Sequence, residues 1–158
     1  MAREHQYRLD VTWTGNQGAG TANYRGYSRD HTVESENTEA VLGSADASFR
    51  GDATRWNPEQ LFLASIANCH MLWYLHLAVR AGVVVTNYRD KPTATMREDT
   101  DGGGEFTLVA LHPHVTISGS SDVDVAAKLH GDVAQFCFIA RSVRVPIEHH
   151  PVIEVALH

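Results

Sequence analysis

Hydrophobic and polar side chains alternate at the start of the chain. Tyr7, Leu9, Val11 and Trp13 fall on one face of an extended segment, and the residues between them are polar. This alternation predicts a half-buried β-strand. A glycine-rich turn follows at residues 15–20, and residues 21–33 predict a second strand. Because a strand and not a helix follows these glycines, the turn does not match a dinucleotide-binding fingerprint.

The clearest helix start in the chain is the segment Asn57-Pro58-Glu59-Gln60. Asparagine is a strong N-cap, proline fits the first helical position, and Gln60 stands where a capping box places its second member. The run that follows is apolar on nearly every side, which predicts a helix buried on most of its surface. Gly82 is the expected helix end.

The second half of the chain alternates between strand-like and helical patterns. Residues 83–96 and 105–118 predict two strands joined by a hairpin turn at 101–104. A second helix is expected from residue 121 to about 136, another helical turn at 138–143, and a final strand at 152–157. The sequence thus predicts one α+β domain, with antiparallel sheets packed around two principal helices.

Size and charge narrow the function classes. The chain has 158 residues, a mass of 17.4 kDa and a formal charge of −6. A single domain of this size can bury a core without disulfides or a structural metal. The acidic balance argues against nucleic acid or an anionic membrane as the main partner. No run of about 20 apolar residues and no apolar leader is visible, so we expect a cytoplasmic protein without a membrane span.

Two cysteines and ten histidines are the candidate reactive groups. Cys69 lies inside the apolar helix, and Cys137 lies near the end of the second predicted helix. A free cysteine often packs as a small buried hydrophobe. The alternative is a redox pair, in which one thiolate is oxidised by a peroxide to a sulfenic acid and condenses with the second thiol. Packed helices could bring the two sulfurs together.

The segment from Asn57 to Cys69 resembles the signature of the OsmC/Ohr family, the osmotically inducible protein C and organic hydroperoxide resistance proteins. That signature is Asn-Pro-Glu-x-Leu, then small residues, then cysteine. The order of the remaining elements resembles the family over almost the whole chain, residues 1–158. The resemblance implies an OsmC/Ohr-like fold, an intertwined homodimer and thiol-dependent reduction of organic hydroperoxides, with inorganic peroxide as a further candidate substrate. An external dithiol would restore the enzyme, with no cofactor.

The resemblance also implies roles for individual residues. Cys69 corresponds to the peroxidatic cysteine, because it follows the Asn-Pro-Glu motif at the family spacing. Cys137 corresponds to the resolving cysteine, and Glu59 to the active-site glutamate that partners an arginine. The family's arginine lies in the turn after the first strand, where this chain has no arginine. Arg25 or Arg29 could supply the charge instead, and Arg29 is the preferred candidate.

Two departures indicate a divergent subfamily: the missing turn arginine, and Phe138 where many relatives have proline. Geometry adds a constraint on Glu59. Ten residues along a straight helix, about 15 Å, separate Glu59 from Cys69. Either the Asn-Pro-Glu segment bends away from the cysteine helix, or Glu59 serves a cysteine of a partner chain. As a plain alternative, Glu59 is a first-turn acid that complements the helix dipole.

For several other residues, a structural role and a functional role are both consistent with the sequence. The histidines show no tight zinc-ligand spacing, and His70 is expected to be a hydrogen-bonded core or interface residue. Trp73, Tyr74 and Phe136 could shape an apolar pocket or belong to the core. Two other functions stay open: a nonenzymatic ligand-binding or redox-sensing module on the same fold, and, less favoured, a histidine-based metal-binding protein.

Overall fold

A computed structural model describes residues 3–157 of the chain. The chain divides into two compact units, one of residues up to 62 and one of residues from 63 onward. The prediction of one domain over residues 1–158 stays a prediction.

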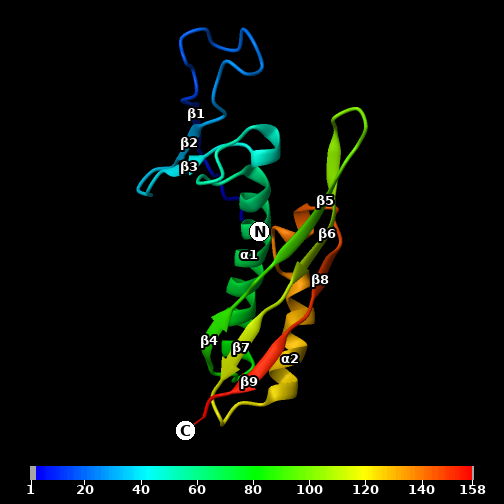
Figure 1. The fold of residues 1–158 in the computed structure, drawn as a ribbon. Coiled ribbons are helices and arrows are strands. Elements are labelled where there is room, and N and C mark those ends of the chain that lie inside the picture. The colour runs from blue at the N-terminus through cyan, green and yellow to red at the C-terminus, as the bar shows by residue number, and fades with distance from the viewer. Residues whose placement is uncertain (1–2, 158) are drawn as a thin grey trace. The chain divides into compact units, whose positions relative to one another are not determined.

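The first unit contains a small antiparallel sheet with the strand order β1-β2-β3 (Figure 1). Its strands are β1 (Asp10–Trp13), β2 (His31–Glu34) and β3 (Val41–Gly43), and the 3-10 helix η1 (Ala47–Phe49) follows. The predicted opening strand is confirmed, but its predicted burial is wrong. Val11 is 67% exposed and Trp13 43% exposed, so the described residues of the first unit leave the apolar face of β1 exposed.

Only the end of the predicted second strand is extended. Residues 20–27 form turns, and β2 begins at His31. Asn23 explains the difference, because its side chain accepts a hydrogen bond from the Arg25 backbone (3.0 Å) and its carbonyl accepts one from Gly26 (3.1 Å). An asparagine that bonds its own following backbone favours a turn over a strand.

Helix α1 (Pro58–Arg80) starts and stops where the sequence predicts. Asn57 Oδ1 accepts from the Gln60 N–H at 2.8 Å, and Gln60 Oε1 accepts from the Asn57 N–H at 3.1 Å. These two bonds form the predicted capping box. Gly82 adopts a φ of 73°, and the Val83 N–H reaches the Ala78 carbonyl at 2.9 Å, which closes a Schellman motif.

The predicted burial of α1 on most sides is not observed in the single chain. Leu72 is 62% exposed and Val79 80% exposed. Among the described residues, α1 is also the one helix long and apolar enough to cross a membrane, although only 33% of its most apolar window is buried. Core helices of water-soluble proteins pass the same test. An apolar surface on α1, including Leu72 and Val79, is therefore left exposed by the described residues of the second unit.

Prolines divide the two long predicted strands. Residues 83–96 give β4 (Val85–Arg89) and β5 (Thr93–Glu98), with Pro92 between them. Residues 105–118 give β6 (Gly104–Leu111) and β7 (His114–Ile117), with Pro113 between them. A proline has no N–H for the strand ladder and ends the pairing. The predicted hairpin turn at 101–104 joins β5 and β6.

The sheets are mostly antiparallel as predicted, and each of the last two strands adds a parallel pairing that the sequence did not predict. β8 (Ile147–His149) runs parallel to β6, and β9 (Val152–Val155) runs parallel to β7. The second unit therefore holds two three-stranded sheets, β4-β7-β9 and β5-β6-β8 (Figure 1). The overall class, α+β with mostly antiparallel pairing, is as predicted.

The second principal helix and its extensions complete the second unit. Asp122 caps α2 (Val123–Asp132) by accepting from the N–H groups of Asp124 (2.9 Å) and Val125 (3.0 Å). The 3-10 helices η2 (Val133–Gln135) and η3 (Ala140–Ser142) follow, the latter within the predicted helical turn. α2 packs against β9 (Figure 1). The core combines α1, β7 and α2 side chains, including Tyr74, Leu77, Val115, Ile117, Ala126 and Leu129.

Candidate active site

The fold brings the two cysteines together although 68 positions separate them in the sequence. Cys69 lies in the middle of α1, and Cys137 lies just beyond η2. The Cys137 side chain is buried in the core cluster, and the partly exposed Cys69 packs against that cluster. Both are free thiols, and they lie close enough for Cys69 to act on the pKa of the Cys137 thiol. This proximity makes a disulfide between them geometrically accessible.

The surroundings of the two sulfurs differ. Burial, and then the hydrogen bond with Cys69, raise the pKa of the Cys137 thiol to about 11. The Ala140 N–H donates to Cys137 Sγ at 3.4 Å and acts in the opposite direction. Cys137 therefore stays protonated at neutral pH, and a protonated thiol is a poor nucleophile. The more exposed Cys69 is the sulfur that a reagent reaches first.

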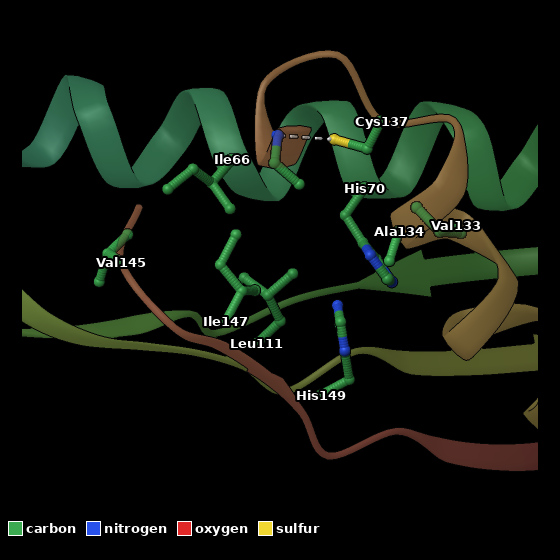
Figure 2. A pocket seen from close by; sticks show the side chains of 10 residues that line it. Ile66, His70, Leu111, Val133, Ala134, Cys137, Val145, Ile147 and His149 are labelled. Carbon is green, nitrogen blue, oxygen red and sulfur yellow. Dashed lines mark hydrogen bonds between the residues drawn. The ribbon is translucent and has the colours of Figure 1, made fainter. Parts of the chain in front are cut away.

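A cavity of about 190 Å³ adjoins Cys137 in the second unit (Figure 2). Its walls are mostly aliphatic and come from α1, β6, η2 and β8, with Ile66, Leu111, Val133 and Ile147 among them. The polar groups in the lining are the Cys137 thiol and the imidazoles of His70 and His149. In Figure 2, His70 extends from α1 and His149 from the strand below, and the two rings approach each other.

Three histidines form a buried cluster beside this cavity. His70 Nε2 lies 2.9 Å from His130 Nδ1, and the His149 ring stacks on His70 with centroids 4.6 Å apart. Burial, followed by the neighbouring imidazoles, lowers the pKa of His70 to about 3, and burial chiefly lowers that of His130 to about 4. Burial also lowers the pKa of His149. All three rings are therefore neutral at physiological pH.

The expectation for His70, a hydrogen-bonded core residue, is confirmed. The sequence did not predict that His130 and His149 join this cluster, because positions 70, 130 and 149 are far apart and fit no helical or strand periodicity. One sequence feature indicates burial of His130. It lies on the same face of α2 as the apolar residues Ala126 and Leu129.

Several buried polar atoms near the cluster have no hydrogen-bond partner. They are Tyr88 Oη, Asp90 Oδ2 and His130 Nε2. Tyr74 stacks on His130 with centroids 4.0 Å apart, and its hydroxyl donates to the Ala126 carbonyl at 3.1 Å. Burial raises the pKa of the Asp90 carboxyl. Buried polar groups normally find a partner, so this region is suited to an internal water.

The aromatic residues considered as pocket walls have other positions. Tyr74 is fully buried in the core, and the cavity lining is aliphatic apart from its two imidazoles. Trp73 stacks on Phe136 with centroids 5.4 Å apart and meets Phe138 edge-on at 5.7 Å. The core alternative is therefore confirmed for Tyr74 and for Trp73, which packs against the core cluster, and Phe136 stacks on Trp73.

Glu59 occupies the first turn of α1, and α1 continues without interruption to Arg80. Of the two alternatives for Glu59, the bend of the Asn-Pro-Glu segment away from the cysteine helix is therefore not observed. Glu59 Oε2 is buried and has no hydrogen-bond partner. A buried carboxylate oxygen without a donor is costly, which makes Glu59 a position suited to binding a cation or an N–H donor.

Arg29 is held by its own segment of the first unit. Its guanidinium donates to the carbonyls of Tyr27 (2.6 Å) and Tyr24 (2.7 Å), and it lies over both tyrosine rings at 4.1 and 4.5 Å. Arg25 is exposed. Within residues 3–157 neither arginine forms an ion pair with Glu59, so the pairing of Glu59 with an arginine stays a prediction.

No group of three or more His, Cys, Asp or Glu side chains in the described part of the chain has an arrangement that could hold a metal ion. The surface histidines instead form pairs. His114 lies 3.0 Å from Glu154, and His150 lies 3.2 Å from Glu148 and stacks on His112.

The fold and the paired thiols define the OsmC/Ohr class of α+β proteins. The family model for OsmC-like proteins matches residues 51–150, which include Glu59, both cysteines and the histidine cluster. The chain therefore belongs to the OsmC-like protein family. Among curated protein sequences, none matches this chain.

Solved structures agree with this assignment. An OsmC-like protein of unknown function from Vibrio cholerae is 27% identical, with a TM-score of 0.84 over 94% of this chain and 100% of its own. An organic hydroperoxide resistance protein from Legionella pneumophila superposes with a TM-score of 0.69 at 17% identity, over 98% and 100% of the two chains. A Bacillus subtilis organic hydroperoxide resistance protein gives 0.62 at 18% identity, over 96% and 98%. The family thus includes proteins of hydroperoxide resistance.

Proposed function

We propose that this protein is a thiol-dependent peroxidase that reduces organic hydroperoxides. The observation that carries the proposal is the packing of Cys69 against the core cluster that contains Cys137, which brings a partly exposed thiol and a buried thiol together. Membership of a family that includes hydroperoxide resistance proteins supports it. Inorganic peroxide is a further candidate substrate.

The proposed cycle has three steps. The Cys69 thiolate attacks the distal oxygen of the hydroperoxide, the O–O bond breaks, and the alcohol leaves with a proton while Cys69 becomes a sulfenic acid. Cys137 then attacks the oxidised sulfur, its proton leaves with the hydroxide as water, and the disulfide forms. An external dithiol reduces this disulfide through a mixed disulfide, with no cofactor involved.

Glu59 is proposed to position the arginine that assists Cys69. Glu59 Oε2 is buried without a hydrogen-bond partner, and a guanidinium could donate two parallel hydrogen bonds to this carboxylate. Because α1 is unbroken, we favour a site in which Glu59 serves a cysteine of a partner chain. Arg29 is the candidate cation. Its guanidinium would have to release the carbonyls of Tyr24 and Tyr27 and donate to the Glu59 carboxylate instead. Arg25 is the alternative.

A homodimer would cover the apolar surface that the single chain leaves exposed. Val79 and Val84 are exposed beside an apolar groove of the second unit that Leu75 and Val85 also line. Asn68 and His76 interrupt the apolar surface of α1 with polar groups, which favours a protein partner over lipid. We propose an intertwined homodimer in the cytoplasm. Sedimentation should show a dimer, and Val79→Lys should shift it toward monomer.

The decisive test of the activity is peroxide consumption by purified protein with a dithiol present. Cys69→Ser should abolish turnover. Cys137→Ser should still undergo the first oxidation but should accumulate sulfinic and sulfonic acid at Cys69, which mass spectrometry detects. Unchanged turnover by Cys69→Ser would overturn the proposal.

The cavity favours a second candidate function, a nonenzymatic ligand-binding or redox-sensing module on the same fold. Such a module would form the Cys69–Cys137 disulfide once but would turn over slowly. Sustained peroxide consumption over many equivalents separates the enzyme from the sensor.

A further inference from the structure

Two hydrogen bonds join α1 to α2 inside the core of the second unit. His70 Nε2 on α1 lies 2.9 Å from His130 Nδ1 on α2. One turn further along α1, Tyr74 Oη donates to the Ala126 carbonyl on α2 at 3.1 Å. In each helix the two positions are four residues apart and share one face, and the order of the pairs shows that the helices run antiparallel. We call these four residues the interhelical clamp.

The clamp is next to both cysteines along the chain. His70 immediately follows Cys69. On the other helix, α2 passes at Val133 into η2, and the Cys137 N–H donates to the Val133 carbonyl at 2.9 Å. The backbone therefore transmits the position of His130 to Cys137. A shift of α2 along α1 would displace Cys137 relative to Cys69.

A disulfide tolerates little displacement of this kind. Its two Cβ atoms must lie about 3.5–4.5 Å apart, whereas one residue of helix corresponds to a rise of about 1.5 Å and a rotation of about 100°. Leu77 and Leu129 share the apolar core cluster of the two helices, and such apolar contacts have no preferred direction. Hydrogen bonds weaken steeply when they are misaligned, so the clamp can define the register more sharply than the apolar contacts.

The clamp is buried, which makes slippage costly. His70 is 3% exposed, His130 1% and Tyr74 0%, and the Tyr74 ring stacks on His130 with centroids 4.0 Å apart. His130 Nε2 has no partner, so among residues 3–157 the bond to His70 is the one hydrogen bond of that ring. A slip would leave further polar groups unpaired inside the core. In coiled coils a single buried polar residue is enough to fix the register.

We propose that the interhelical clamp fixes the register of α2 against α1, and that His70 and His130 are positioning residues that hold Cys137 where it can pair with Cys69. This role rests on the proposed redox pairing of the two cysteines and adds the device that aligns them. It requires neither imidazole to touch a sulfur or to exchange a proton with it.

Four variants separate the hydrogen bonds from the packing. His130→Phe keeps a ring against Tyr74 and removes the bond to His70. His130→Asn has less volume, but its amide can reach the place of Nδ1. Tyr74→Phe removes the second bond alone. Leu129→Ala opens a hole in the core beside the clamp without removing a clamp residue, and it is the matched control.

The measurement is an equilibrium of the full chain with oxidised and reduced glutathione. Glutathione disulfide takes the two hydrogens of the thiols, and mass spectrometry quantifies the Cys69–Cys137 disulfide. His130→Phe should lower the equilibrium constant of its formation at least about tenfold, the effect of a lost buried hydrogen bond, and Tyr74→Phe should lower it by a smaller factor. His130→Asn should recover most of this loss. Leu129→Ala should lose stability in urea and keep the disulfide.

Peroxide gives a readout that separates the two oxidation steps. In His130→Phe, one equivalent of cumene hydroperoxide should form the Cys69 sulfenic acid, trapped by dimedone, at an unchanged rate. The following condensation with Cys137 should be slower. Loss of overall stability alone would not divide the steps in this way.

An unchanged equilibrium constant in His130→Phe, or a value for His130→Asn as low as for His130→Phe, would overturn the inference. If His130→Phe does not fold, an unchanged constant in Tyr74→Phe overturns it instead. A weakened disulfide in His130→Phe, together with no peroxide turnover by the unmodified chain, would support the clamp and contradict the peroxidase. Peroxide turnover with an unchanged constant in His130→Phe would do the reverse.

Discussion

Cys69 packs against the core cluster that contains Cys137, and the two thiols occupy different surroundings, one partly exposed on α1 and one buried after η2. The asymmetry assigns an order to their chemistry. The accessible sulfur meets the oxidant, and the buried one, whose pKa is about 11, acts afterwards on a sulfur already in contact with it.

Alkylation tests this asymmetry without any substrate. At pH 8 only about 0.1% of a thiol with a pKa near 11 is ionised, so Cys137 should react far more slowly with iodoacetamide than Cys69. Peptide mass spectrometry over a time course measures both rates. In urea both residues should react at similar rates, which is the control. Equal labelling in the folded protein would contradict the assigned order.

Replacement of Glu59 separates its two possible roles. If the carboxylate positions an arginine, Glu59→Gln should lower kcat/KM by about 10- to 100-fold, the effect of losing one charge-assisted hydrogen bond. If it only complements the helix dipole, activity should persist and the free energy of unfolding should fall by about 0.3–1 kcal/mol. Glu36→Gln, at an exposed position of the same unit, is the matched control.

The buried histidines predict a loss of stability in acid. The pKa of His70 is about 3 and that of His130 about 4 in the folded protein, against 6.5 for the ordinary residue. The unfolded chain therefore binds more protons between these values, and stability present above pH 6.5 is lost as the pH falls. Between about pH 6 and pH 4 the two groups should lower the free energy of unfolding by up to about 2.7 kcal/mol per pH unit.

Urea denaturation at a series of pH values measures this slope. His130→Phe keeps an aromatic ring against Tyr74 and removes one titrating group, so the slope should fall to about half. The exposed His114→Gln should leave it unchanged. An unaltered slope in His130→Phe would show that other groups cause the acid sensitivity.

The helix cap that precedes the reactive cysteine should be worth a measurable amount. Asn57→Ala removes the acceptor for the Gln60 N–H and should lower the free energy of unfolding by about 1 kcal/mol. Asn57→Ser keeps an acceptor and should recover most of that loss. Urea unfolding of the unmodified chain and the two variants measures these differences in the free energy of unfolding. Equal stability of Asn57→Ala and the unmodified chain would contradict the capping role.

Local chemistry made parts of this fold predictable. The capping box at Asn57 and the end at Gly82 depend on residues a few positions apart, and both are observed. Strands with strong alternation were also correctly located, whereas their interruptions at Pro92 and Pro113 and the parallel pairing of β8 and β9 were not predicted. A strand of three or four residues carries no signal for its direction.

In the candidate site too, features that depend on neighbouring residues were predictable and features that depend on tertiary packing were not. A motif that ends at Cys69 identified the family, but nothing in the sequence places His130 and His149 around His70, because tertiary packing alone brings them together. Burial of β1 was predicted incorrectly for a related reason. Alternation shows which face is apolar, and it does not show what covers that face.

Oxidation of the reduced protein by one equivalent of cumene hydroperoxide tests the central claim most directly. Non-reducing peptide mass spectrometry should find a single Cys69–Cys137 disulfide, with two hydrogens lost and both thiols consumed, and an added dithiol should reverse it through repeated cycles. Oxidation that leaves Cys137 free, or that joins either cysteine to another partner, would contradict the assignment.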